Sequence, residues 1–306
     1  MIKPPNFILA GFPKCGTTSL FAYLEEHPEI FIPKRKEMNY FTNHIISKLT
    51  EGKGDKIVND YQVSSWDEYI NYYTSVKKEI AIGDASPSYI NFPSCFDEIN
   101  KKLNNPKVII IVRDPIKRAF SNYLHLYKKG RETLDFYSAI QEEEKRKTLN
   151  YSPFWYYKKH SLYYDKIVQA KKSFNEVLIL TQEELKLNSK QVLKKVYDFL
   201  EVNNDFVPSN LDTTYNAGGV YKKNLITQIF TRDSYLKNII LKKLPMVVKI
   251  KPLKDKILKN FQISTPTIDL ESEKFLVEYF KEDVIKLSEL GINTALWNEK
   301  YFSNKG

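Results

Sequence analysis

The sequence contains five consecutive β-branched residues, Val108–Val112. A strand with one face in water alternates apolar and polar side chains, whereas a parallel strand covered by helices is apolar on both faces. The run therefore predicts a central strand of a parallel sheet over residues 107–112. Asp114 and Pro115 follow it, a side-chain cap and a ring that suits the first helical turn, so we expect a helix from there to Lys129.

Apolar runs and helical patterns alternate along the rest of the chain. Further strands are predicted over residues 7–10, 30–32, 80–83 and 177–180. Helices are predicted over residues 17–24, 66–76, 94–103, 162–174, 191–200 and 271–290, the last with a buried stripe of Phe275, Leu276, Tyr279, Val284 and Leu287. Strands that alternate with helices indicate an α/β fold, in which helices flank a parallel sheet. Since no repeat or linker divides the sequence, we expect one domain over residues 1–306.

The chain of 306 residues carries a formal net charge of +10, which suits an anionic partner such as a nucleotide, an acidic glycan or a membrane surface. A nucleic-acid partner is not expected, because the sequence has no signature of a nucleic-acid-binding motif. Residues 235–261 combine eight lysines and one aspartate with many aliphatic residues. This segment is interpreted either as buried aliphatic side chains with outward lysines or as a contact with an anionic membrane surface.

The two cysteines, Cys15 and Cys95, imply no disulfide framework and favour a reducing compartment. The first residues lack the charged and apolar regions of a signal peptide, and no apolar stretch approaches the roughly 20 residues that cross a bilayer. We therefore expect a soluble, cytoplasmic protein.

The segment Gly11–Ser19 joins the first predicted strand to the first predicted helix. Such a loop presents unpaired backbone N–H groups to an anion, and the helix dipole adds to the attraction. Lys14 supplies a positive charge there, and Thr17, Thr18 and Ser19 supply hydroxyl groups. An ATP or GTP P-loop carries a lysine where Thr17 stands, so this segment predicts a phosphate site of a different kind. The alternative is a surface loop with an incidental lysine.

The pattern Pro-Lys-x-Gly-Thr-Thr in this loop resembles the signature with which one family of sulfotransferases binds the 5'-phosphosulfate of 3'-phosphoadenosine-5'-phosphosulfate (PAPS). In motif style it is similar to carbohydrate enzymes of the heparan sulfate type and to bacterial enzymes. The resemblance implies a P-loop-like nucleotide site formed by Lys14, Cys15, Gly16, Thr17, Thr18 and Ser19. Lys14 would also stabilise the oxygen that leaves sulfur. Two interpretations of Cys15 are open, a small residue in a tight loop and a reactive thiol at a helix N-terminus.

Two more segments resemble nucleotide-binding parts of this family. Arg113 opens an Arg-Asp-Pro motif after the central strand, and Ser121 lies on the helix that follows. The resemblance implies that both hold the 3'-phosphate, whose oxygens match the donor fork of an arginine. Residues 216–223 resemble a Gly/Lys loop that closes over the nucleotide, which implies that Tyr221, Lys222 and Lys223 bind it. A surface hairpin is the alternative.

Two acidic residues resemble acceptor-side positions of the family. Glu37, in Lys-Glu-x-Asn-Tyr-Phe, matches the general base of heparan-type enzymes and would contact the acceptor, with a surface ion-pair cluster as the alternative. Asp84 would orient the acceptor or assist Glu37, and a loop cap is its alternative. Ala85 stands where heparan-type enzymes carry a lysine. Small-molecule members of the family use a histidine as base. Here His27 precedes Pro28 and resembles a structural turn of the family, and His44, His125 and His160 lie in no matching motif.

The resemblance implies transfer of a sulfuryl group from PAPS to a hydroxyl or amine group, which leaves adenosine 3',5'-bisphosphate and requires no metal. The expected acceptor is a carbohydrate or glycolipid. Two other functions stay open. A P-loop nucleoside or nucleotide kinase would show Mg-dependent ATP turnover, and a non-catalytic nucleotide- or glycan-binding protein would bind PAPS without turnover.

Overall fold

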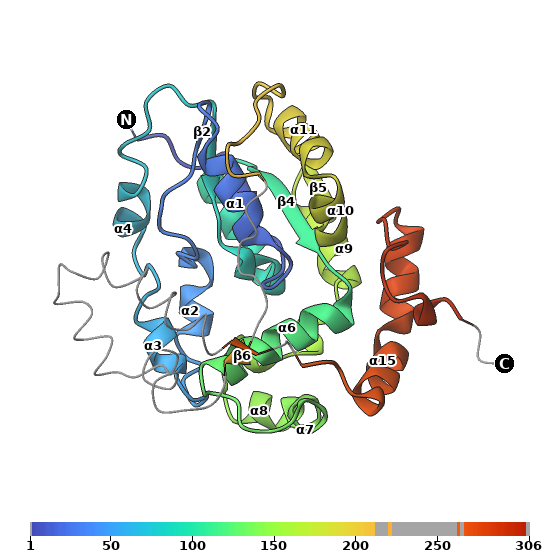
Figure 1. The fold of residues 1–306 in the computed structure, drawn as a ribbon. Helices are drawn as coiled ribbons and strands as arrows, with labels where there is room; N and C mark the ends of the chain where they lie inside the picture. Colours follow the sequence, from blue (N-terminus) through green and yellow to red (C-terminus); the bar gives the residue numbers. More distant parts are fainter. Residues whose placement is uncertain (1, 212–219, 222–261, 264–265, 304–306) are drawn as a thin grey trace.

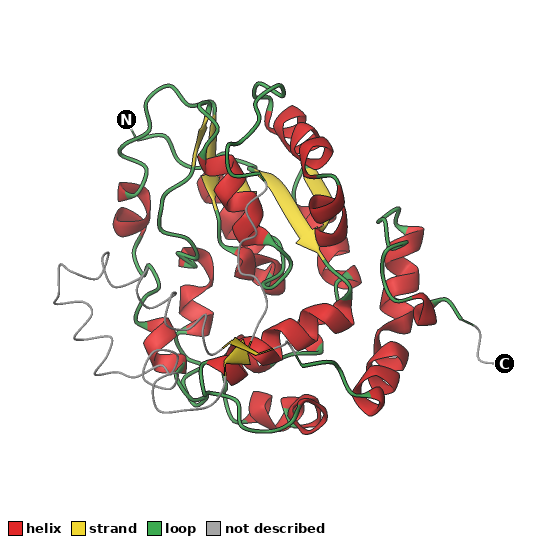
Figure 2. Ribbon diagram, in the orientation of Figure 1, coloured by secondary structure: helices red, strands yellow, loops and turns green. Residues whose placement is uncertain are grey.

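The computed structural model describes residues 2–211, 220–221, 262–263 and 266–303 (Figure 1). Its centre is a parallel sheet of five strands in the order β2-β3-β1-β4-β5 (Figure 2). The strands are β1 (Phe7–Leu9), β2 (Ile30–Phe31), β3 (Ala81–Asp84), β4 (Lys107–Val112) and β5 (Val177–Thr181). Strand β4 pairs with β1 and β5, and every residue of Val108–Val112 is at most 1% exposed. The predicted central strand and the α/β fold class are confirmed.

Helices precede and follow the strands. They are α1 (Thr17–Glu25), α2 (Asn43–Ile46), α3 (Asp55–Asn59), α4 (Trp66–Asn71), α5 (Phe96–Leu103), α6 (Pro115–Lys128), α7 (Phe136–Gln141), α8 (Glu143–Thr148), α9 (Tyr164–Ser173), α10 (Gln182–Leu187), α11 (Ser189–Leu200) and α15 (Leu270–Glu289). A two-stranded antiparallel sheet pairs β6 (Val220–Tyr221) with β7 (Gln262–Ile263). In the part of the chain that the structure describes, no helix has both the length and the apolar character required to span a bilayer.

The order of the strands places helices on both faces of the sheet. The connection through α1 moves from β1 to β2, whereas those through α5 and α9 move in the other direction along the sheet. Because such crossovers are right-handed, α1 lies on one face and α5 and α9 lie on the other. Ring contacts agree with this arrangement. The ring centres of Phe96 in α5 and of Phe174, directly after α9, lie 5.0 Å apart, and those of His27, after α1, and Tyr197 in α11 lie 4.7 Å apart.

Helix α15 lies on the side of the molecule opposite α3 and α4 (Figure 1). Its buried apolar residues are Leu276, Phe280, Val284 and Leu287. Their spacing of four, four and three residues keeps them on one side of the helix. The predicted stripe was wrong at Tyr279, which is 38% exposed, because Phe280 takes the buried position. The ring centres of Tyr279 and Phe275 instead lie 5.5 and 5.6 Å from Nζ of Lys158.

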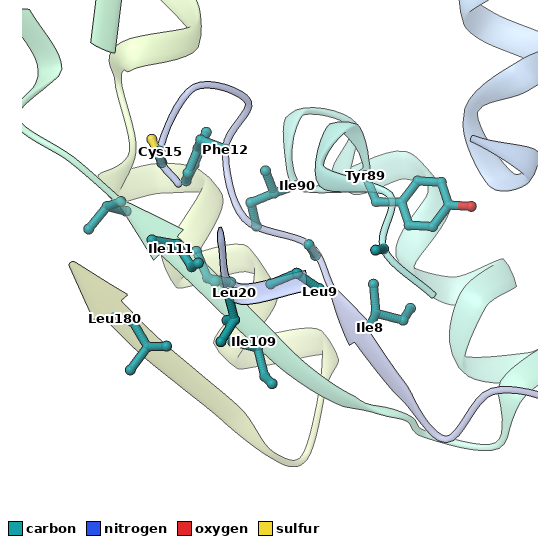
Figure 3. Close-up of a cluster of buried hydrophobic side chains, with 14 of the residues drawn as sticks. Ile8, Leu9, Phe12, Cys15, Leu20, Tyr89, Ile90, Ile109, Ile111 and Leu180 are labelled. Atoms are coloured by element: carbon teal, nitrogen blue, oxygen red, sulfur yellow. The ribbon is translucent and has the colours of Figure 1, made fainter. Parts of the chain in front are cut away.

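The carboxyl ends of the parallel strands meet at one edge of the sheet, where ligands of such folds bind. Gly11, after β1, lets the chain pass very close to β4, since a Cβ atom there would lie 2.7 Å from the backbone N of Ile111. Figure 3 shows the side chains that pack beneath this exit, among them Leu9, Leu20 and Ile109. The exit loop is therefore held firmly against the core. That residues 1–306 form one domain stays a prediction.

Candidate functional site

A pocket of about 690 Å³ lies at the carboxyl edge of the sheet. Its wall includes most of the residues that the sequence singled out: Lys14, Gly16, Thr17, Thr18, Ser19, Glu37, Arg113 and Ser121. These residues follow three different strands and come together because parallel strands end at the same edge. Cys15 and Asp84 are not in this wall. Only the backbone of Tyr221, in β6, is described, and Lys222 and Lys223 lie outside the described residues.

The loop between β1 and α1 presents donors to the pocket. Gly16 occupies the N-cap position of α1 with a φ of 99°, a left-handed conformation that favours glycine, and no side chain caps the helix. Within the described residues, the backbone N–H groups of Gly16, Thr17 and Thr18 donate to no protein acceptor. Three unpaired N–H groups at the start of a nine-residue helix form an anion-binding site.

Lys14 adds an ammonium group to this loop, and the environment shifts its pKa. Its backbone is also left-handed, with a φ of 76°, so the loop turns sharply at this residue. Burial lowers the pKa of Lys14 to about 8, and the charge of Glu37 opposes this shift. A desolvated ammonium that faces a pocket interacts strongly with an anion, because little water screens it.

Two arginines lie behind the loop. Nη1 of Arg113 donates to the backbone oxygen of Lys14 at 3.4 Å, while its buried Nε has no hydrogen-bond partner among the described residues. Arg118 is only 1% exposed and donates to the oxygens of Pro13 at 3.1 Å and Tyr157 at 3.0 Å. Arg113 thus keeps an unused donor beside the pocket, whereas Arg118 fixes the loop.

Glu37 lies between the 690 Å³ pocket and a second pocket of about 430 Å³, since it contributes to the wall of both. Glu37 and Asn39 both have left-handed backbones, with φ of 57° and 52°. Two bonds hold this unusual turn: the N–H of Glu37 donates to the oxygen of Ala85 at 2.9 Å, and the N–H of Asn39 donates to Oγ of Ser86 at 3.3 Å. Backbone strain of this kind is typical of functional sites.

Asp84 is buried and lines neither pocket, so the predicted contact with an acceptor does not agree with its geometry. The side chain is fully buried, and its carboxylate accepts hydrogen bonds from the hydroxyls of Ser86, Tyr69 and Tyr89 at 2.7, 2.9 and 3.0 Å. Burial raises the pKa of Asp84, although these hydrogen bonds oppose the rise. The alternative, a loop cap, fits the structure better, because the carboxylate accepts from Ser86 in the loop after β3.

Cys15 is packed into the core beside Phe12 (Figure 3). Its thiol is fully buried, lies 3.9 Å from the hydroxyl of Tyr163, and has a pKa that burial raises to about 12. Its backbone N–H donates to Phe12. A reactive thiolate is therefore excluded in this environment, and the small-residue interpretation fits the structure.

Sequence reasoning missed several residues of the pocket. Gln182 and Lys186 line it and follow β5, so their place after a strand was the available signal. Ser88 donates to Oδ1 of Asn39 at 2.6 Å. His125 also lines the pocket, and burial, with the charge of Lys14, lowers its pKa well below the ordinary value. No local motif marks His125, because helix α6 brings it to the pocket.

Comparison with known proteins gives consistent matches. Residues 4–217 match the family model of the sulfotransferase domain. The membrane-associated sulfotransferase kil1 of Dictyostelium discoideum is 34% identical over 119 residues, which cover 39% of this chain and 22% of that protein. Carbohydrate sulfotransferase 15 of Homo sapiens is 29% identical over 168 residues, which cover 45% of this chain and 30% of that protein. The matches thus span less than a third of either relative.

A solved structure matches over nearly the full length. The crystal structure of a sulfotransferase from Alicyclobacillus acidocaldarius has a TM-score of 0.76 and 27% sequence identity, and the match covers 96% of this chain and 98% of that one.

Proposed function

Since this chain belongs to the sulfotransferase domain family, we propose that it transfers a sulfuryl group from PAPS to a hydroxyl or amine group of an acceptor. The observation that carries this proposal is the 690 Å³ pocket, which brings three unpaired backbone N–H groups and Lys14 to the same cavity as Arg113.

The residues present fit the donor PAPS, which carries a phosphosulfate and a separate 3'-phosphate. The loop Lys14–Ser19 would hold the phosphosulfate at the N-terminus of α1. Arg113 and Ser121 would hold the 3'-phosphate, since the buried Nε of Arg113 has no protein partner among the described residues. The nucleotide contacts of Tyr221, Lys222 and Lys223 stay predictions. That no metal takes part also stays a prediction.

The donor supplies an activated sulfuryl group, and the chain supplies charge and a proton acceptor. Lys14 would stabilise the negative charge that grows on the oxygen leaving sulfur. Glu37 would take the proton of the acceptor group, because this residue lines both pockets. His125 is the competing base, since it lines the same pocket, although its lowered pKa makes it a weaker proton acceptor than an ordinary histidine.

For the acceptor we propose a carbohydrate or glycolipid. The similarity to carbohydrate sulfotransferase 15 and the glutamate at position 37 support this choice. The second pocket, on the other side of Glu37, has room for such a group at about 430 Å³. A cytoplasmic location is also proposed, because both cysteines are free and buried, which suits a reducing compartment. Cell fractionation tests that location, and recovery of the protein in a secreted fraction would contradict it.

The deciding experiment measures release of adenosine 3',5'-bisphosphate from PAPS with a panel of carbohydrate and phenol acceptors. We expect the wild type to transfer sulfate to a carbohydrate hydroxyl. Glu37→Gln should lower turnover by about 10²–10⁴-fold without weakening bisphosphate binding. Full activity in Glu37→Gln together with loss in His125→Asn would move the base to His125. Failure of the wild type to bind the bisphosphate would overturn the proposed function.

A further inference from the structure

Lys36 lines the 430 Å³ pocket and contacts Thr18 in the wall of the 690 Å³ pocket, and the proposed function does not use it. It follows β2 and directly precedes Glu37. Because β2 and β1 are parallel strands of one sheet, the segments after them reach the same edge. This places Lys36 beside the first turn of α1.

The ammonium of Lys36 contacts the phosphosulfate loop itself. Its Nζ donates to Oγ1 of Thr18 at 3.0 Å, and Thr18 lines the 690 Å³ pocket. The same ammonium lies 5.2 Å from the ring centre of Phe21, one helical turn beyond Thr18. The long side chain thus runs along α1 and ends at its N-terminal turn.

The charge of Lys36 is poorly compensated by the protein. Among the described residues no carboxylate lies within ion-pair distance of its Nζ, and Thr18 is a neutral acceptor. Burial lowers the pKa of Lys36, and the charge of Glu37 opposes this shift. An ammonium has three donors, so two remain for another group. A partly buried cation with one neutral partner is stabilised by an anion placed next to it.

We propose that Lys36 binds the sulfuryl end of the donor, as a second cation beside Lys14. This inference rests on the proposed function. Lys14 belongs to the loop, whereas Lys36 reaches it from the segment after β2, and Glu37 interacts electrostatically with both lysines. Lys14 would act on the oxygen that leaves sulfur, whereas Lys36 would hold the sulfuryl oxygens next to Thr18. It remains protonated throughout and exchanges no proton with the acceptor.

A contact between Lys36 and the sulfuryl group and a supporting role for Lys36 predict different binding of PAPS and of the bisphosphate. A residue that only supports Thr18 would affect PAPS and adenosine 3',5'-bisphosphate equally, because both carry the 5'-phosphate that the loop holds. A residue that contacts the sulfuryl group affects PAPS alone. Ala85 adds no charge on this side, since its side chain is an uncharged methyl group.

The test compares Lys36→Met with Lys34→Met, a matched change at an exposed lysine of the same segment. Calorimetry without acceptor gives the Kd of PAPS and of the bisphosphate. For Lys36→Met we expect the Kd of PAPS to rise about tenfold and that of the bisphosphate to stay within about twofold, since one charge-assisted hydrogen bond is lost. The KM for PAPS should rise accordingly. Lys34→Met should bind both nucleotides as the wild type does.

Several outcomes overturn the inference while the proposed function stands. Unchanged PAPS binding in Lys36→Met is one, and equal weakening of both nucleotides is another. Thermal melting checks that Lys36→Met folds, and Lys36→Gln replaces it if it does not. A wild type that binds neither nucleotide refutes the proposed function itself. A wild type with normal turnover, together with unchanged binding in Lys36→Met, refutes only the role of Lys36.

Discussion

Asp84→Asn tests how a buried carboxylate supports the turn that carries Glu37. Asp84 accepts hydrogen bonds from Ser86, Tyr69 and Tyr89, and Ser86 in turn accepts the N–H of Asn39 at 3.3 Å. The amide that replaces the carboxylate has the same shape but offers one acceptor oxygen and one donor nitrogen. At least one of the three hydroxyls must therefore lose its acceptor.

The magnitude follows from that count. An unsatisfied buried hydroxyl costs about 1–3 kcal/mol of unfolding free energy. For 306 residues this corresponds to a melting temperature lower by roughly 2–5 °C. If the amide nitrogen faces Ser86, the bond that holds Asn39 weakens as well. We then expect turnover to fall about tenfold, as for one hydrogen bond, with bisphosphate affinity within about twofold of the wild type.

The assay is thermal unfolding of the wild type and Asp84→Asn between pH 5 and pH 8, with turnover measured in parallel. Because burial raises the pKa of Asp84, the folded chain binds this proton more tightly than the unfolded chain. The group therefore contributes most stability below its ordinary pKa, and the contribution is lost as the pH rises through the folded pKa. The variant lacks this titration, so the difference in melting temperature should widen as the pH falls. If the wild type and Asp84→Asn melt at the same temperature at both pH 5 and pH 8, the reasoning is refuted.

Lys14→Met should lower turnover by about 10²–10³-fold and leave bisphosphate affinity within a few-fold, and unchanged turnover would contradict its role. Because burial lowers the pKa of Lys14 to about 8, wild-type turnover should decline above that pH. The contribution of Lys14 to the stability of the folded chain should instead rise between about pH 8 and pH 10.5. Arg113→Ala should weaken the bisphosphate about 10–100-fold but not a nucleotide without a 3'-phosphate, so equal weakening of both speaks against the assignment. Neither Cys15 nor Cys95, each with a pKa of about 12, should react with an alkylating reagent in the folded chain at pH 7, as mass spectrometry would show.

The core of the fold could be predicted because its signals are local. The strand over residues 107–112 has the predicted bounds, since the β-branched run ends at Val112 and the cap Asp114 follows shortly after it. The order of the strands could not be predicted, because the pairing of β1 with both β3 and β4 is set by packing between distant segments. Helix α4 ends at Asn71, before the predicted end at residue 76, where single turns replace it.

The candidate site was predictable where a loop directly follows a strand, as for Lys14 and Arg113. It was not predictable where a side chain reaches the pocket, or turns away from it, through contacts between distant segments. Asp84 has the sequence context of an acceptor contact, yet two tyrosines enclose its carboxylate. The contact of Lys36 with Thr18 joins residues 18 positions apart, and neither residue indicates it alone.

The position of Arg118 separates two properties of the loop at alkaline pH. Burial lowers the pKa of Arg118 as well, but an arginine starts so high that it keeps its proton where Lys14, with a pKa of about 8, becomes neutral. Arg118, bound to the oxygen of Pro13, therefore keeps the loop in shape and positive after Lys14 has become neutral. Above that pH the protein should still capture the nucleotide but no longer turn it over. At mildly alkaline pH we therefore expect the proposed donor PAPS to bind without being turned over.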